Sequence, residues 1–110
     1  MMIASRLLRL KGTESDTEIP IRIFTPEQDG DAWSCRYEID WPEGTQSMTS
    51  WGMDSIQVLL LALNMIGADI YSSAYHKSGM LMLEAPGQGY GFPLPASLRH
   101  LLRGDDAIDF

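Results

Sequence analysis

The residues that most often do chemistry in proteins are few in this chain and are not spaced for catalysis. A zinc site needs three or four ligands, usually with a close-spaced pair, and the two histidines, His76 and His100, are far apart. The single cysteine, Cys35, lies between Trp33 and Tyr37 on the apolar side of an alternating pattern, where a reactive thiol is not expected. We therefore predict no catalytic residue, no metal site and no cofactor.

The glycine-rich segment 87–91 invites comparison with a phosphate-binding loop, but the comparison fails. The dinucleotide fingerprint joins a strand to a helix, and the P-loop needs a Lys followed by Ser or Thr, whereas Pro93 and Pro95 follow here. Aromatic residues in and around this segment could pack in the core or contact a partner. Our candidate partner-binding or pocket residues are Trp41, His76, Tyr90, Phe92 and His100.

The composition indicates one acidic globular domain. The chain has 110 residues, of which 45% are hydrophobic and 21% charged, and 8 Lys and Arg oppose 15 Asp and Glu for a net charge of −7. Nucleic acid and anionic membranes are poor partners for such a chain, because binding phosphate needs a clustered positive field. A basic protein partner is favoured instead. We expect a domain over 1–104 and an acidic tail over 105–110, with Asp105 and Asp106 solvated.

The N-terminal segment and the apolar runs predict a cytoplasmic protein with no membrane anchor. Arg6, Arg9 and Lys11 interrupt the apolar residues at the start of the chain, so no signal-peptide core is formed. The longest uninterrupted apolar run, Val58–Leu63, is far too short to cross a bilayer. One cysteine also suits a reducing compartment.

The elements that must position the candidate residues begin with strands in the first half of the chain. From Trp33 to Trp41 apolar and polar residues alternate, which is typical of a strand with one buried face. Short, turn-rich gaps between successive strands favour an antiparallel meander. The four strands that we expect are Ile3–Lys11, Ile19–Phe24, Trp33–Trp41 and Gln46–Trp51.

A long helix follows, and its start carries the strongest local signal. Asp54 and Gln57 fit a capping box, and Met53 and Val58 fit a hydrophobic staple. The helix should run to about Ile70 or Ser73, with a glycine in its apolar stripe that lets the helix approach the sheet closely. The expected core-facing stripe is Ile56, Leu59, Leu60, Leu63, Ile66, Gly67 and Ile70.

A second apolar ridge, formed by Val58, Leu61 and Met65, lies on another side of the same helix. A helix that is apolar on two sides must be covered on two sides. The C-terminal segment or a second subunit could supply this cover, so the chain is a monomer or a homodimer. Beyond the helix we expect a short strand over Met80–Glu84, a glycine-proline loop, and a short helix over Ser97–Arg103.

The predicted fold class is therefore α+β: an antiparallel four-stranded meander with one long helix packed on one face, followed by a C-terminal strand, loop and short helix. Several motifs resemble those of a family of small bacterial proteins of unknown function. The motifs are Ile3–Arg6, Trp33–Tyr37, Trp51–Gln57, Leu61–Leu63, Ile66–Ala68 and Gly91–Pro93. The resemblance implies a bacterial domain, and it supplies no activity and no catalytic residue.

Two classes of function remain open from the sequence. The first is a non-enzymatic protein-interaction module, for example an immunity or antitoxin-like protein that neutralises a basic toxin. The second is a small-molecule-binding protein or enzyme with a pocket between the sheet and the C-terminal loop. Residues that could line such a pocket are Tyr37, Trp41, His76, Tyr90 and His100.

Overall fold

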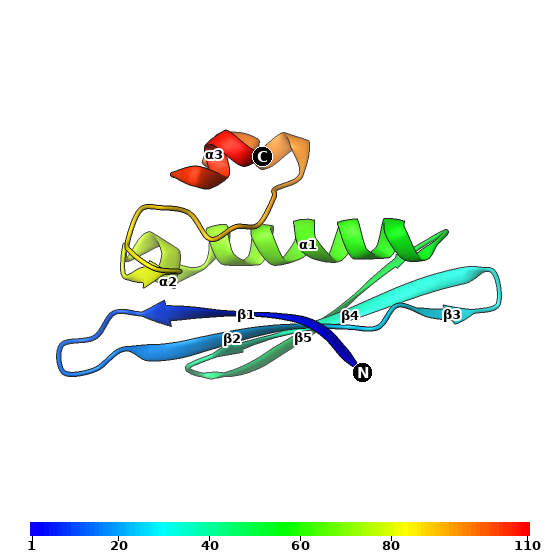
Figure 1. The fold of residues 1–110 in the computed structure, drawn as a ribbon, viewed down its shortest axis with the longest axis horizontal. Coiled ribbons are helices and arrows are strands. Elements are labelled where there is room, and N and C mark those ends of the chain that lie inside the picture. Colours follow the sequence, from blue (N-terminus) through cyan, green and yellow to red (C-terminus); the bar gives the residue numbers. More distant parts are fainter.

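The computed structural model describes residues 1–110 and has α+β architecture, with one long helix lying between an antiparallel sheet and the C-terminal segment (Figure 1). The strands are β1 (Met2–Leu10), β2 (Thr17–Phe24), β3 (Glu27–Asp29), β4 (Ala32–Trp41), β5 (Gly44–Gly52) and β6 (Leu81–Met82). The helices are α1 (Ser55–Ser72), α2 (Ala74–Lys77), the 3-10 helix η1 (Ala96–Leu101) and α3 (Asp105–Asp109).

The meander predicted from the alternation is confirmed and carries two further short strands. β1 pairs with β2, β2 with β4, and β4 with β5, all antiparallel. The three-residue β3 pairs with the first residues of β4 beyond the end of β2, and β6 pairs with Arg9 and Leu10 at the free edge of β1. The sheet therefore has six strands, because β3 extends the pairing along β4 and β6 adds a strand at the outer edge of β1.

The register of β4 places its apolar residues toward the helix, as the alternation predicts. Cys35, Tyr37 and Ile39 are buried. The charged residues between them lie on the outer face, where Arg22 of β2 forms a bidentate pair with Asp40 at 2.7 and 2.9 Å. A one-residue slip would exchange the two faces, so burial of one face specifies the pairing.

The start of α1 follows the capping prediction in part. Asp54 Oδ1 accepts a hydrogen bond from the backbone N–H of Gln57 at 2.7 Å, which satisfies one of the free donors at the helix start. The Gln57 side chain accepts from the N–H of Met53 at 2.6 Å, one residue earlier than in a capping box. The predicted hydrophobic staple is wrong, because Met53 is exposed whereas Val58 is fully buried.

The face of α1 that packs on β4 and β5 differs from the predicted stripe. Ile66, Gly67 and Ile70 are buried as expected, but Ile56 and Leu60 are exposed, and Val58 takes part in the core. Apolar residues surround the first half of this helix, so periodicity alone does not select a face. Contacts with the sheet select the buried face. On β5, the hydroxyl of Ser50 donates to the Val58 carbonyl oxygen at 2.7 Å.

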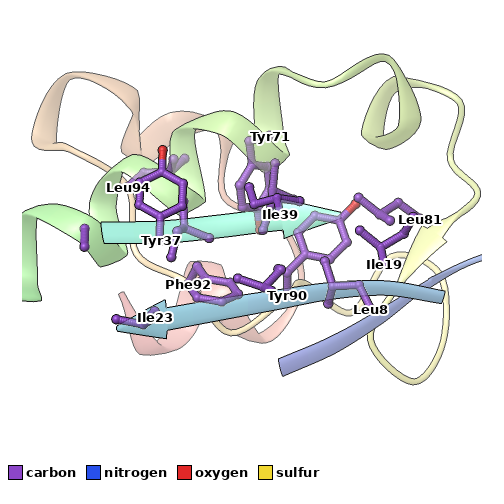
Figure 2. Packing of buried hydrophobic residues seen from close by; sticks show 14 of the residues in the cluster. Leu8, Ile19, Ile23, Tyr37, Ile39, Tyr71, Leu81, Tyr90, Phe92 and Leu94 are labelled. Carbon is purple, nitrogen blue, oxygen red and sulfur yellow. The ribbon is translucent and has the colours of Figure 1, made fainter. Parts of the chain in front are cut away.

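The C-terminal segment completes the core beside α1. Tyr90, Phe92 and Leu94 are buried. Figure 2 shows Tyr90 and Phe92 among side chains of β1 and β2, including Leu8 and Ile23. The helix thus covers β4 and β5, and this segment helps to cover β1 and β2.

The glycine inside α1 permits a close approach, but to a different neighbour from the one predicted. A Cβ atom on Gly67 would lie 1.9 Å from the carbonyl oxygen of Pro93. The C-terminal segment, and not the sheet, therefore requires glycine at this position. Figure 1 shows this segment above the C-terminal half of α1.

By length and composition alone, α1 is apolar enough to cross a membrane. Helices of soluble cores pass the same criterion, and here α1 lies across β4 and β5.

Candidate functional site

The most buried charged group of the molecule is Asp106, which is only 2% exposed. Its carboxylate accepts hydrogen bonds from the Tyr71 hydroxyl at 2.6 Å and from the backbone N–H groups of Tyr90 and Gly91, each at 2.7 Å. The expectation that solvent surrounds Asp106 is therefore wrong. The three donors compensate the loss of hydration, so this carboxylate fastens α3 to the glycine-rich loop and to α1.

Three aromatic rings, those of Tyr71, His76 and Tyr90, meet edge to face beside this carboxylate, with centroids 4.9–5.5 Å apart. His76 lies on α2, whose N-cap Ser73 accepts from the His76 N–H at 3.1 Å. Its Nδ1 lies 2.6 Å from the Tyr90 hydroxyl oxygen. Burial, reinforced by the charge of Arg103, lowers the pKa of His76, and burial together with Asp106 raises the pKa of Tyr90 to about 12.

A cavity of about 360 Å³ opens next to this cluster, between α2, β6 and the glycine-rich loop. The polar and charged side chains that line it are those of His76, Lys77, Tyr90 and Arg103. The volume falls within the range of small-molecule sites, roughly 300–1,000 Å³. We call this space the basic cavity, because its charged lining residues are all cationic or, in His76, able to become so.

A second polar network joins the sheet to α1. Tyr37 of β4 donates to Asp69 Oδ2, and the Gln46 amide donates to the same oxygen at 3.2 Å. Gln46 in turn accepts from the Trp41 indole N–H at 2.8 Å, and the Trp41 ring stacks on Tyr75 at 5.2 Å. Burial raises the pKa of Asp69, although the hydrogen bonds from Tyr37 and Gln46 oppose that shift.

Sequence reasoning missed Asp69 as a partner of Tyr37. The available signal was Tyr37 itself, because it belongs to the inward row of β4 and a buried tyrosine hydroxyl usually finds a hydrogen-bond partner. Nothing in the local pattern identified that partner, since the contact joins residues 32 positions apart.

Where the C-terminal loop lies over β1 and β2, the space between loop and sheet is small. A cavity of about 130 Å³ lies beside Arg6, Ile21 and Phe92, below the usual size of a ligand site. Arg6 Nη1 donates to the carbonyls of Tyr90 and Gly91 at 3.1 and 2.7 Å, and its guanidinium lies 5.0 Å from the Phe92 ring centroid. Arg6 thus holds the loop against β1.

In a comparison with known protein families, the family model described as "Domain of unknown function (DUF6968)" matches residues 4–94. The chain belongs to the DUF6968 family. The match covers the sheet, α1, α2 and the loop through Leu94, and it confirms the resemblance to a family of unknown function. No curated protein and no solved structure matches this chain.

The five candidate residues of this DUF6968 protein lie in different surroundings. Tyr90 and Phe92 are buried packing residues, and the structure brings Tyr90 together with His76. Trp41 is half-buried in the separate network around Asp69. His100 is exposed on η1 and joins neither cluster.

The predicted ridge of Val58, Leu61 and Met65 is not a single exposed surface of the DUF6968 domain. Val58 is fully buried against the sheet, Met65 is half-buried, and only Leu61 is exposed. The helix face that Leu61 borders turns toward solvent, whereas the side of Val58 turns toward β5.

The start of α1 carries a different set of apolar side chains. Met53, Ile56 and Leu60 are 82%, 69% and 55% exposed, and Leu61 beside them is 38% exposed. We call these four residues the apolar patch. Met53 lies just before α1 and the other three lie in its first two turns. Leu60 also borders a cavity that Leu94 and Phe110 of the C-terminal segment line.

Proposed function

We propose that this DUF6968 protein is a non-enzymatic interaction module that binds a basic protein partner through the apolar patch. The observation that carries the proposal is the exposure of Met53, Ile56 and Leu60 on a helix whose other side is core. Outward helix faces in globular proteins are usually polar. Exposed neighbouring apolar side chains on a folded domain commonly mark an interaction surface.

The energetic reason for a partner is the water-exposed area of these side chains. Full burial of one Leu, Ile or Met side chain is worth roughly 1.5–3 kcal/mol. Such residues at the centre of an interface supply much of the binding energy, provided that polar neighbours exclude water around them. Gln57 and Asn64, on the same helix side, are suitable polar neighbours.

The charge distribution supports a basic partner. Asp54 caps α1 beside the patch. The hairpin of β3 and β4, with Asp29 at the end of β3 and Asp31 in the turn, lies at the same end of the molecule (Figure 1). Against a net charge of −7, a cationic surface is attracted over a distance and is oriented before contact. A basic toxin that this protein neutralises, as immunity and antitoxin proteins do, is a partner of this kind.

The two alternatives, a small-molecule pocket and a homodimer, have less support. The small cavity near Arg6 offers a substrate little room, which speaks against a binding pocket where the loop covers β1 and β2. A homodimer would bring two copies with charge −7 together, at a cost in electrostatic repulsion that a basic partner avoids.

Site-directed photocrosslinking in cells of the source organism tests the proposal. A photoreactive residue at position 60 should capture one basic protein, whereas the same residue at exposed Ser72, at the far end of α1, should not. The captured protein is then purified and its affinity measured by titration calorimetry.

Leu60→Glu should weaken that affinity at least about tenfold, and the matched variant Ser72→Glu should leave it unchanged. Crosslinks only between two copies of this chain, or equal affinities of both variants for the captured protein, would refute the proposal.

A further inference from the structure

The basic cavity combines positive charge with an absence of carboxylates. Lys77 and Arg103, two of only eight Lys and Arg in the chain, line it, and none of its lining residues is acidic although the chain has 15 acidic residues. The three ion pairs of the molecule involve Arg22 and Arg36 on the outer face of the sheet. Neither Lys77 nor Arg103 is neutralised by a carboxylate. One guanidinium nitrogen of Arg103, Nη1, donates to the carbonyl oxygens of Leu101 and Leu102 at 3.0 and 3.2 Å, so its other N–H groups are those that could meet a ligand.

We propose that the basic cavity is a binding site for a small phosphate monoester. Lys77 and Arg103 supply positive charge, and the hydrogen-bonded pair His76–Tyr90 supplies polar groups at the cavity wall. Guanidinium and ammonium groups are the side chains that best match phosphate oxygens. This site lies beside α2, at the opposite end of α1 from the apolar patch, so it is independent of the proposed interaction surface.

The shape of the cavity fits more than a bare anion. Gly79 and Gly87 line it, and a Cβ on either would meet no atom within 4 Å, so both leave open backbone at the wall. A volume of about 360 Å³ accommodates the phosphate together with an organic group. The organic group can lie along this open wall while the cations hold the phosphate.

Binding of a phosphate should change the pKa of His76, because of the charged groups around this side chain. Arg103 and Lys77 line the cavity with His76, and the carboxylate of Asp106, which holds the Tyr90 backbone, is occupied by Tyr71 and two backbone donors. Burial and the charge of Arg103 hold the pKa of His76 below its usual value. A phosphate dianion in the cavity would oppose both effects, because an opposite charge nearby favours protonated imidazole.

The test is an NMR pH titration of His76, with phenyl phosphate as the probe and ionic strength held constant. Saturating phenyl phosphate should raise the pKa of His76 by about one unit. By linkage, phenyl phosphate should bind more tightly as His76 becomes protonated. Benzoate, a carboxylate with a similar ring, should produce less than half of the shift.

Charge-removing variants identify the residues that hold the probe. Arg103→Gln and Lys77→Gln should each weaken phenyl phosphate binding at least about tenfold, whereas the matched control Arg99→Gln, on exposed η1, should bind like the wild type. Circular dichroism checks that each variant is folded, and Lys77→Gln carries the test if Arg103→Gln is not. No shift at His76, an equal shift with benzoate, or unchanged binding by both variants would overturn the proposal.

Discussion

The carboxylates of Asp69 and Asp106 are shielded from solvent, and each accepts a hydrogen bond from a tyrosine that is more than 30 positions away in the chain. Asp106 is satisfied by three donors, whereas Asp69 accepts from Tyr37 and Gln46 and remains partly accessible. The two sites show opposite ways of stabilising a carboxyl group in a core. At Asp106, which is 2% exposed, the hydrogen bonds compensate the free-energy cost of removing the carboxylate from water. At Asp69 burial raises the pKa, so protonation of the carboxyl group relieves part of that cost.

The pH dependence of stability should report on Asp69. Because burial raises the pKa of Asp69, the folded protein binds a proton there more tightly than the unfolded chain does, and this group favours folding as the pH falls. The free energy of unfolding of the wild type, relative to that of Asp69→Asn, should increase between about pH 7 and about pH 4. Urea denaturation followed by circular dichroism measures this difference.

Asp40 provides a control of opposite sign. The Arg22 guanidinium holds the pKa of Asp40 below its usual value, so this group stabilises the fold at neutral pH, and its contribution is lost as the pH falls. Relative to Asp40→Asn, the wild type should therefore lose stability on acidification. A difference between wild type and Asp69→Asn that is constant with pH, or that decreases as the pH falls, would contradict the assignment.

At the scale of elements, α1 serves two neighbours at once. One side of α1 packs on β4 and β5. On another side, the segment around Pro93 crosses the C-terminal half of the helix at Gly67. Gly67 is the point of closest approach, where a missing side chain lets a backbone carbonyl reach the helix surface. Glycine costs an α-helix about 1 kcal/mol relative to alanine, so this packing opposes helix propensity.

Gly67→Ala should destabilise the protein although alanine is the better helix former. The new Cβ would lie 1.9 Å from the Pro93 carbonyl oxygen, so the helix or the C-terminal segment must shift. We expect a net loss of about 1–3 kcal/mol in the free energy of unfolding. Ser72→Ala at an exposed position of the same helix should change it by no more than about 0.5 kcal/mol. Equal or greater stability of Gly67→Ala would show that the close approach is not required.

At the scale of the whole molecule, the chain end closes the fold. The 110 residues form a body of 49 × 28 × 19 Å in which the last helix returns to the glycine-rich loop. Residues 95–110 lie outside the family match and yet contribute the buried Asp106 and the cavity-lining Arg103. The end of this chain therefore both stabilises the family domain and adds charged groups to its surface.

Truncation after Gly104 measures this contribution. The truncated chain lacks Asp106, so the Tyr71 hydroxyl and the N–H groups of Tyr90 and Gly91 lose their acceptor. We expect a loss of at least about 3 kcal/mol in the free energy of unfolding, measured by urea denaturation. Asp106→Asn should account for a large part of it, and Asp105→Asn at an exposed position should have little effect. An unchanged unfolding midpoint after truncation would mean that the tail is dispensable.

Local patterns determined the four long strands, the long helix and the buried face of β4, but they did not predict β3, α2 or α3. Alternation in residues 33–41 predicted which side of β4 is buried, because a strand has only two sides and charges exclude one of them. The cap at Asp54 predicted the start of α1 because its bond to Gln57 spans only three residues. The order of the meander followed from the short connections between its strands.

Only the tertiary structure decided which side of α1 is core, what Gly67 accommodates and where Asp106 lies. Apolar residues surround the first half of α1, so its periodicity fits more than one orientation, and the choice depends on the sheet and the C-terminal segment together. The Asp106 contacts join residues up to 35 positions apart. Local sequence preferences do not encode such contacts, because they arise only when separate elements pack and bring their unsatisfied polar groups together.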